Sequence, residues 1–149
     1  MSASLIFDIA PIGSIIAWSD GSTQPPERHK KKLSAWKTRN SQGRLVRKQP
    51  GRTTGSYVAL PDFTIHENDF GSAGTIVLRV FQTFSIDSDL AFKVVERPAP
   101  GSVRVFDRPG GQLVHLAASH ADAEGWLKQH GYPDAVLDQV AAGEGRAAA

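Results

Sequence analysis

Cysteine is absent from the 149-residue chain, and so are long apolar runs. Without thiols the protein forms no disulfide, thiol nucleophile or cysteine-based zinc site, a composition usual in the cytoplasm. The first residues carry no basic segment, and Asp8 interrupts their apolar run, so we expect no signal peptide. No apolar stretch approaches the roughly 18 to 20 residues that a membrane span needs. We therefore expect a soluble, cytoplasmic protein with no membrane partner.

Motifs of catalysis and of cofactor or metal binding are missing too. No serine stands in G-x-S-x-G, and no glycine run matches a phosphate-binding loop or the dinucleotide fingerprint. The five histidines have no zinc spacing. Residues 66–69 and 87–89 carry oxygen ligands without the calcium-loop pattern, and we interpret both as polar turns. The sequence predicts a non-enzymatic protein without catalytic residues, cofactor or metal.

Acidic residues are missing from one long stretch, which we call the basic segment. From Arg28 to Arg52 the chain has ten Lys and Arg and no Asp or Glu. Since the whole chain has 17 basic and 15 acidic residues, only 7 basic residues remain elsewhere against all 15 acidic ones. A basic segment on an acidic body is the strongest functional indication in the sequence.

We predict that the basic segment forms a β-hairpin. Residues 32–39 and 44–48 flank a four-residue turn that ends in Gly43, where a positive φ is expected. The alternative is a helix over about residues 26–38, which would place Trp36 on its apolar face.

Ten cations beside an indole ring could follow a phosphate backbone and stack on an unpaired base. We therefore predict a nucleic-acid-binding protein, for DNA or RNA, that contacts phosphates through the basic hairpin. The alternative is a small inhibitor or adaptor whose basic face docks on an acidic protein partner. A solvated loop that only offsets the acidic body is a third interpretation. The predicted nucleic-acid-binding residues are Arg28, Lys30, Lys31, Lys32, Trp36, Lys37, Arg39, Arg44, Arg47, Lys48 and Arg52.

The most strand-like stretch runs from Gly74 to Ser85, because nearly every residue in it is β-branched, aromatic or Leu. One face is apolar and the other mixed, which predicts an interior strand of an antiparallel sheet, preceded by a loop at 67–74. Residues 90–96 alternate in the same way and are predicted to complete a hairpin with it. Further short strands are expected at 5–9, 14–18, 57–60 and 63–65.

A proline-rich stretch at 97–101 separates a smaller C-terminal part. Residues 103–106 and 113–117 are predicted to form a hairpin, followed by a helix that Ser119 caps and that ends at His130-Gly131. A second short helix is expected over 134–142.

The predicted fold class is α+β, with a mainly antiparallel, partly closed sheet or small barrel, a C-terminal hairpin and two short C-terminal helices. Residues 1–96 would form a β-rich domain that carries the basic hairpin (28–52). Residues 102–142 are too few to fold alone and are expected to dock on that domain. Residues 143–149 are expected to be a frayed tail.

Overall fold

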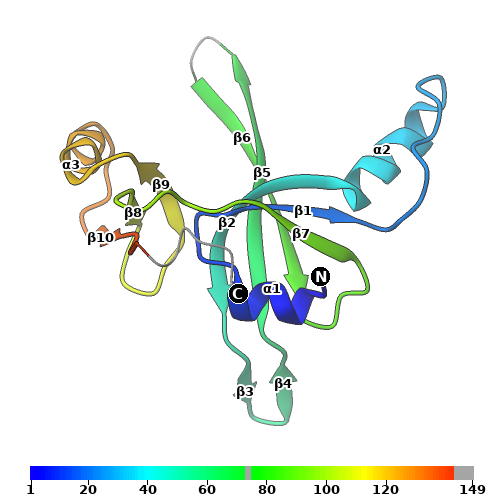
Figure 1. Cartoon of the computed structure of the whole chain (residues 1–149), viewed down its shortest axis with the longest axis horizontal. Coiled ribbons are helices and arrows are strands. Elements are labelled where there is room, and N and C mark those ends of the chain that lie inside the picture. Colours follow the sequence, from blue (N-terminus) through cyan, green and yellow to red (C-terminus); the bar gives the residue numbers. More distant parts are fainter. Residues whose placement is uncertain (73–74, 143–149) are drawn as a thin grey trace.

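The computed structural model describes residues 1–72 and 75–142 and contains antiparallel sheets and three helices (Figure 1). The predicted mixture of helices and mostly antiparallel strands is confirmed. The larger sheet has the strand order β6-β5-β2-β1-β7. Its strands are β1 (Ile15–Ser19), β2 (Ser41–Gln49), β5 (Asp62–Ser72), β6 (Thr75–Ser85) and β7 (Ala91–Glu96).

The main core lies between this sheet and helix α1 (Ala3–Ile9). The strand predicted at 5–9 was wrong. Ser2 caps the helix, its hydroxyl accepting from the Leu5 N–H at 3.2 Å, and the buried Ala3, Ile6 and Ala10 recur at helical spacing. The remaining buried members of this core are Ile16, Trp18, Leu45, Phe63, Ile65 and Phe92.

The strand at Thr75–Ser85 exists, but its place in the sheet was mispredicted. It is an edge strand, paired with β5 alone, and β7 pairs with β1 at the opposite edge. The two edges approach through side chains, since the Phe84 and Phe92 ring centroids are 5.2 Å apart. No hydrogen-bonded pairing between β6 and β7 closes the sheet in the described part of the chain. The predicted barrel closure is therefore not found, because α1 and aromatic packing fill the gap instead of a ladder.

The loop predicted at 67–74 was also wrong over its described residues. β5 continues to Ser72, and its pairing with β6 contains register shifts between His66 and Asn68 and between Phe70 and Gly71. Such bulges absorb residues that would interrupt a regular ladder, so a polar stretch remains paired through its backbone.

The basic hairpin was wrong, and the helical alternative is close to the structure. Helix α2 (Lys30–Arg39) precedes β2, which lies at the centre of the sheet. Lys, Arg and Leu are good helix formers, whereas the centre of the sheet gives β2 two hydrogen-bonded neighbours. Gly43 is not a turn residue: it lies within β2, and a Cβ there would collide with the His66 carbonyl oxygen. Strands β3 (Arg52–Thr54) and β4 (Tyr57–Ala59) form a separate small hairpin.

The C-terminal unit, residues 102–142, contains a sheet of order β10-β8-β9. Its elements are β8 (Val103–Phe106), β9 (Leu113–Ala117), β10 (Val136–Gln139) and helix α3 (His120–Gln129). The β8–β9 hairpin and the helix start are confirmed, and the Ser119 hydroxyl accepts from the Asp122 N–H at 3.2 Å. The second helix was wrong, because β10 completes the open edge of β8. The tail predicted at 143–149 lies outside the described residues.

A buried arginine joins the C-terminal unit to the loop before β1. Arg104 is 4% exposed, its Nε donates to the Ile12 carbonyl at 2.7 Å, and Nη1 lies 2.9 Å from a carboxylate oxygen of Asp138. A buried charge is stable only when it is paired and hydrogen-bonded. Here the carboxylate partner belongs to the C-terminal unit itself, and the bond to the Ile12 carbonyl crosses the junction.

Candidate nucleic-acid interface

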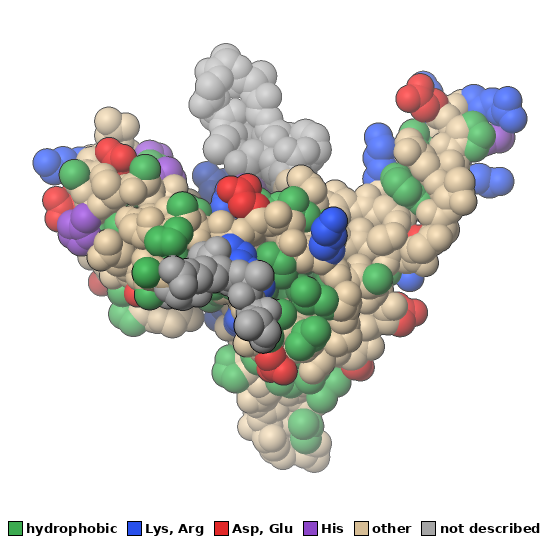
Figure 2. Space-filling view, viewed as in Figure 1, with side chains coloured by type: hydrophobic (Ala, Val, Ile, Leu, Met, Phe, Trp, Pro, Cys, Tyr) green, Lys and Arg blue, Asp and Glu red, His purple; other side chains and the backbone are tan. Residues whose placement is uncertain are grey.

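The ten cations of the basic segment divide into two groups. Six of them lie on what we call the arm, residues 28–39, which consists of α2 and the two residues before it. The arm projects from the sheet, well away from the C-terminal unit (Figure 1). Figure 2 shows Lys and Arg side chains gathered at its end. The exposed cations of the arm are Arg28, Lys30, Lys31, Lys32, Lys37 and Arg39.

The N-terminus of α2 is electrostatically unfavourable as it stands. His29 occupies the N-cap position without a side-chain hydrogen bond to the helix, and the first turn contains no acid. Lys30, Lys31 and Lys32 instead place three positive charges at the positive end of the helix dipole. No residue of α2 is buried, so apolar packing does little to offset this charge. An anion bound here would relieve the repulsion.

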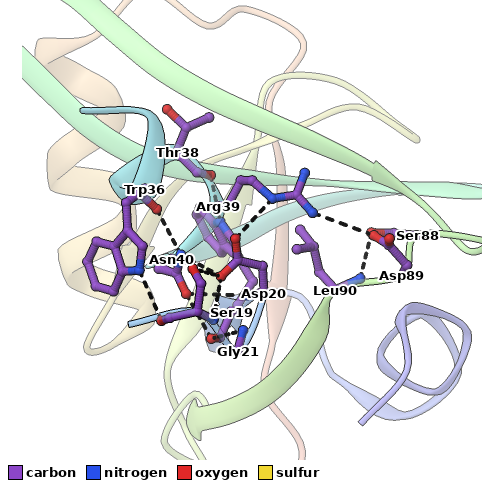
Figure 3. Close-up of polar contacts among 12 residues, drawn as sticks. Ser19, Asp20, Gly21, Trp36, Thr38, Arg39, Asn40, Ser88, Asp89 and Leu90 are labelled. Atoms are coloured by element: carbon purple, nitrogen blue, oxygen red, sulfur yellow. Dashed lines mark hydrogen bonds and ion pairs between the residues drawn. The ribbon is translucent and has the colours of Figure 1, made fainter. Parts of the chain in front are cut away.

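A polar network holds the base of the arm, which we call the base network (Figure 3). Asn40 follows α2, and its Nδ2 donates to Asp20 at 3.1 Å and to the Trp36 carbonyl at 2.9 Å. Its Oδ1 accepts from the Ser19 hydroxyl at 2.8 Å. Arg39 Nε lies 3.2 Å from Asp20 Oδ2. These bonds tie the end of α2 to the end of β1.

Asp20 is the acceptor at the centre of the base network. The Ser22 hydroxyl and N–H, followed by Asn40, lower the pKa of the Asp20 carboxyl well below its usual range, with Arg39 adding to the effect. Hydrogen bonds to the ionised form stabilise it, so the network is complete only while Asp20 is charged.

The two tryptophans near the arm both donate to backbone carbonyls. Trp36 Nε1 donates to the Ser22 carbonyl at 3.1 Å, and the buried Trp18 donates from Nε1 to the Thr38 carbonyl at 3.0 Å. Trp36 is half-buried. Both indoles therefore help to position α2, a role that the sequence did not indicate for Trp36.

The other four cations lie apart from the arm. Arg44 donates to the Gly13 carbonyl, and Arg47 is half-buried on β2. Lys48 Nζ lies 5.9 Å from the centroid of the Phe7 ring, and burial lowers the pKa of Lys48. Arg52 is exposed on the β3–β4 hairpin. The fold thus brings together only the arm members of the predicted site.

An open cleft of about 500 Å³ runs along the inner side of α2. Lys30, Leu33, Ser34, Lys37 and Thr38 line it from the helix, and Glu67, Val80 and Gln82 line it from β5 and β6. Nothing along the chain indicated that β5 and β6 would face the arm, and residues 66–69 of β5 were interpreted as a polar turn. Among the residues that the structure describes, the cleft places two arm lysines opposite one carboxylate.

The model of one protein family, described as Uncharacterised conserved protein UCP036055, matches residues 1–144. The chain belongs to this family. No curated protein matches it, and no solved structure matches it.

Two further findings concern the described residues alone. None of their helices is long and apolar enough to cross a membrane. They also contain no group of three or more His, Asp or Glu side chains that could hold a metal ion.

Proposed function

We propose that the protein binds nucleic acid, without catalysing a reaction on it, by laying the arm against the phosphate backbone. The observation that carries the proposal is the tip of α2, where four cations from Arg28 to Lys32 surround a helix N-terminus that has neither a cap nor an acid. Phosphates are favoured at such a helix end, because free N–H groups, the dipole and the side-chain charges all attract them.

The arm contacts phosphates and reads little sequence. Lysines are point charges that follow a backbone, whereas base readout requires bidentate side chains in a groove. Trp36 is engaged by Ser22, so we assign it to positioning the arm. Arg39 is partly neutralised by Asp20 and belongs to the base of the arm. The proposed contact residues are therefore Arg28, Lys30, Lys31, Lys32 and Lys37. A cytoplasmic location of the protein is also part of the proposal.

The salt dependence of binding tests this mode of contact. If four or five phosphates are neutralised, log affinity falls linearly with log salt, at a slope of about −0.7 to −0.9 per contact. Fluorescence anisotropy with a labelled single strand and a labelled duplex, each in two unrelated sequences, gives the slope and the sequence preference. We expect a steep slope and nearly equal affinity for the two sequences.

A matched pair of triple variants separates the arm from the total charge. Lys30→Gln, Lys31→Gln and Lys32→Gln together reduce the slope by about two to three units, because each lost contact removes nearly one. Arg52→Gln, Lys93→Gln and Lys128→Gln remove the same charge from exposed positions outside the arm and leave the slope unchanged. Equal effects of the two triples would mean that only net charge matters. If no nucleic acid binds at low salt, the acidic-partner alternative replaces this proposal.

A further inference from the structure

The cleft beside the arm has two walls of different chemistry. One wall is one face of α2, since its residues recur at spacings of three and four along the helix. They are Lys30, Leu33, Ser34, Lys37 and Thr38. The other wall consists of Val80 and Gln82, two residues apart on β6 and so on one face of it, and of Glu67 from β5. In Figure 1 both α2 and β6 rise from the sheet.

Contacts at the base of α2 fix the two walls relative to each other. Phe84 lies on the same face of β6 as Gln82, and its ring centroid is 5.1 Å from that of the buried Trp18. Trp18 in turn donates from Nε1 to the Thr38 carbonyl at 3.0 Å. One buried indole therefore joins the C-terminal end of α2 to β6, so the cleft between them is part of the fold.

The charges of the cleft lie on opposite walls. Lys30 and Lys37 are exposed cations seven residues apart, which is about 10 Å along the helix axis. Glu67 lies on the wall that faces them. Gln82 Nε2 donates to Glu67 Oε2 at 3.3 Å and so holds the carboxylate on the sheet side. A polyanion in the cleft is attracted to the helix wall and repelled from the sheet wall.

The uncharged groups of the cleft suit unpaired bases. Leu33 and Val80 offer apolar surface from the two walls. An amide has two N–H donors and an acceptor oxygen, so Gln82 can bind Glu67 and a base edge together. In a single strand the bases can turn toward a protein surface. In a duplex they are stacked between two phosphate backbones, and the second backbone would approach the Glu67 carboxylate.

We propose that the cleft holds a single strand of nucleic acid, with its phosphates on the lysines of α2 and its bases turned toward Val80 and Gln82 of β6. This inference rests on the proposed function, which by itself does not distinguish single strands from duplexes. Glu67 disfavours the second backbone of a duplex. Contact with the faces of bases is tolerant of base identity, so sequence preference stays low.

Fluorescence anisotropy tests the preference for single strands. The probes are a labelled single-stranded DNA, an RNA of the same sequence, and the duplex of that DNA with its complement. We expect the better-bound single strand to bind about tenfold more tightly than the duplex, an effect at the lower end of that for packing one base. A duplex that binds as tightly overturns this inference and leaves the proposed function intact. Binding of none of the probes overturns both.

The absence of cysteine allows the strand to be located. Gln82→Cys and Thr83→Cys each create one thiol, which is modified with a benzophenone maleimide and irradiated with the labelled single strand. Neighbouring residues of a β-strand point to opposite faces, so position 82 faces the cleft and the exposed position 83 faces away from it. We expect a cross-link from position 82 and its loss from position 83. Equal cross-linking from both, or none from position 82 while the strand still binds, refutes the location.

Glu67→Gln tests the selectivity against duplexes. It removes the carboxylate and keeps an oxygen that can accept from Gln82. We expect duplex affinity to rise about threefold and single-strand affinity to change less, so the preference falls. The control Glu96→Gln removes an equal charge from an exposed position of β7 outside the cleft and leaves the preference unchanged. Equal effects of the two variants would refute the role of Glu67.

The apolar contacts are tested by the double variant Leu33→Ala and Val80→Ala. It lowers the preference for single strands by about threefold or more, because the bases lose apolar surface. Circular dichroism verifies that the variant is folded. The control Leu60→Ala and Val95→Ala removes the same groups from side chains that are 47% and 49% exposed outside the cleft, and it leaves the preference unchanged. An unaltered preference in the first variant, or an equal loss in the control, refutes base contact in the cleft.

Discussion

Helices α2 and α3 are both ten residues long and both carry tryptophan as their seventh residue, yet they have opposite relations to the rest of the molecule. The hydroxyl of Ser119 caps α3, an acid lies in its first turn, and Lys128 lies in its last. Helix α2 has an uncapped His29 and begins with three lysines. The first arrangement complements the helix dipole, and the second opposes it at the N-terminus.

The two helices also differ in burial, and α3 is again the better stabilised of the two. Ala123 of α3 is fully buried, and Trp126 packs against the buried apolar residues of the C-terminal unit and stacks with His115, His130 and Tyr132. No residue of α2 is buried, and Trp36 is held through one hydrogen bond to a loop. The comparison indicates that α3 stabilises its unit, whereas α2 displays charge at a cost that a phosphate ligand would offset.

The largest expected contrast concerns the two tryptophans. Trp126→Ala removes a stacked, partly buried ring and costs about 2 to 3 kcal/mol of unfolding free energy, below the range for a fully buried Trp. Trp36→Ala costs about 1 kcal/mol or less, because it removes one hydrogen bond and partial packing. Urea unfolding of both variants measures the difference. Equal costs would contradict the division between a packed helix and a projecting one.

The cap of α3 gives the next effect. Ser119→Ala removes the acceptor of the Asp122 N–H and costs about 1 kcal/mol. The urea midpoint falls while the slope of the transition stays the same. The matched change Ser34→Ala lies at an exposed position inside α2, away from its N-cap, and there we expect no loss, since Ala is the better helix former. An unchanged midpoint for Ser119→Ala would mean that the cap is not formed in solution.

The pH dependence of the melting temperature tests the base network. The folded-state pKa of Asp20 is depressed below 3.8, so its stabilising contribution is present above that value and is lost as pH falls toward the folded-state pKa. Asp20→Asn lowers the melting temperature at neutral pH, and its difference from the parent protein shrinks in acid. Asp89→Asn is the control: this carboxylate is 88% exposed and 3.8 Å from Arg39, so its removal changes little. A difference that stays constant with pH would contradict the role assigned to the Asp20 carboxylate.

The smallest expected effect comes from giving α2 an N-cap hydroxyl like the one that α3 already has. His29→Ser introduces a capping hydroxyl at the N-terminus of α2 and stabilises the helix locally by about 0.5 kcal/mol. Amide hydrogen exchange shows slower exchange in α2 while the global unfolding midpoint stays the same, because an unpacked helix opens without unfolding the core. Unaltered exchange in α2 would indicate that the first turn cannot adopt a capped conformation.

Local signals in the sequence predicted the features that depend on near neighbours. Ser119 capped its helix as expected, and the residues on either side of the 107–111 turn formed the β8–β9 hairpin. These succeeded because capping and tight turns are decided within a few residues. The concentration of cations at 28–52 could likewise be read from the sequence, although the conformation of this segment was mispredicted as a hairpin.

Choices between distant partners could not be predicted in this way. The apolar residues within 5–9 and 136–140 suit either a helix or a strand. Residues 5–9 became part of a helix that packs on a sheet face, whereas residues 136–139 became a strand that pairs with the free edge of β8. Strand β7 joined β1 across the sheet instead of β6, its neighbour in the chain. One cleft is lined by Arg44, His66 and residues 113–116, which come from three strands, and no spacing along the chain reveals this.

The amino-acid sequence by itself determined the charge of residues 28–52, the absence of thiol chemistry and the cap of α3, since each is a property of the residues or of a few neighbours. Tertiary structure decided which of the ten cations are displayed. Asp20, Asn40 and Trp18 hold α2 out from the sheet, while strand pairing places Arg44 and Lys48 in the body of the protein. The physical reason is that exposure depends on what packs against a side chain, and those contacts come from residues far away in the chain.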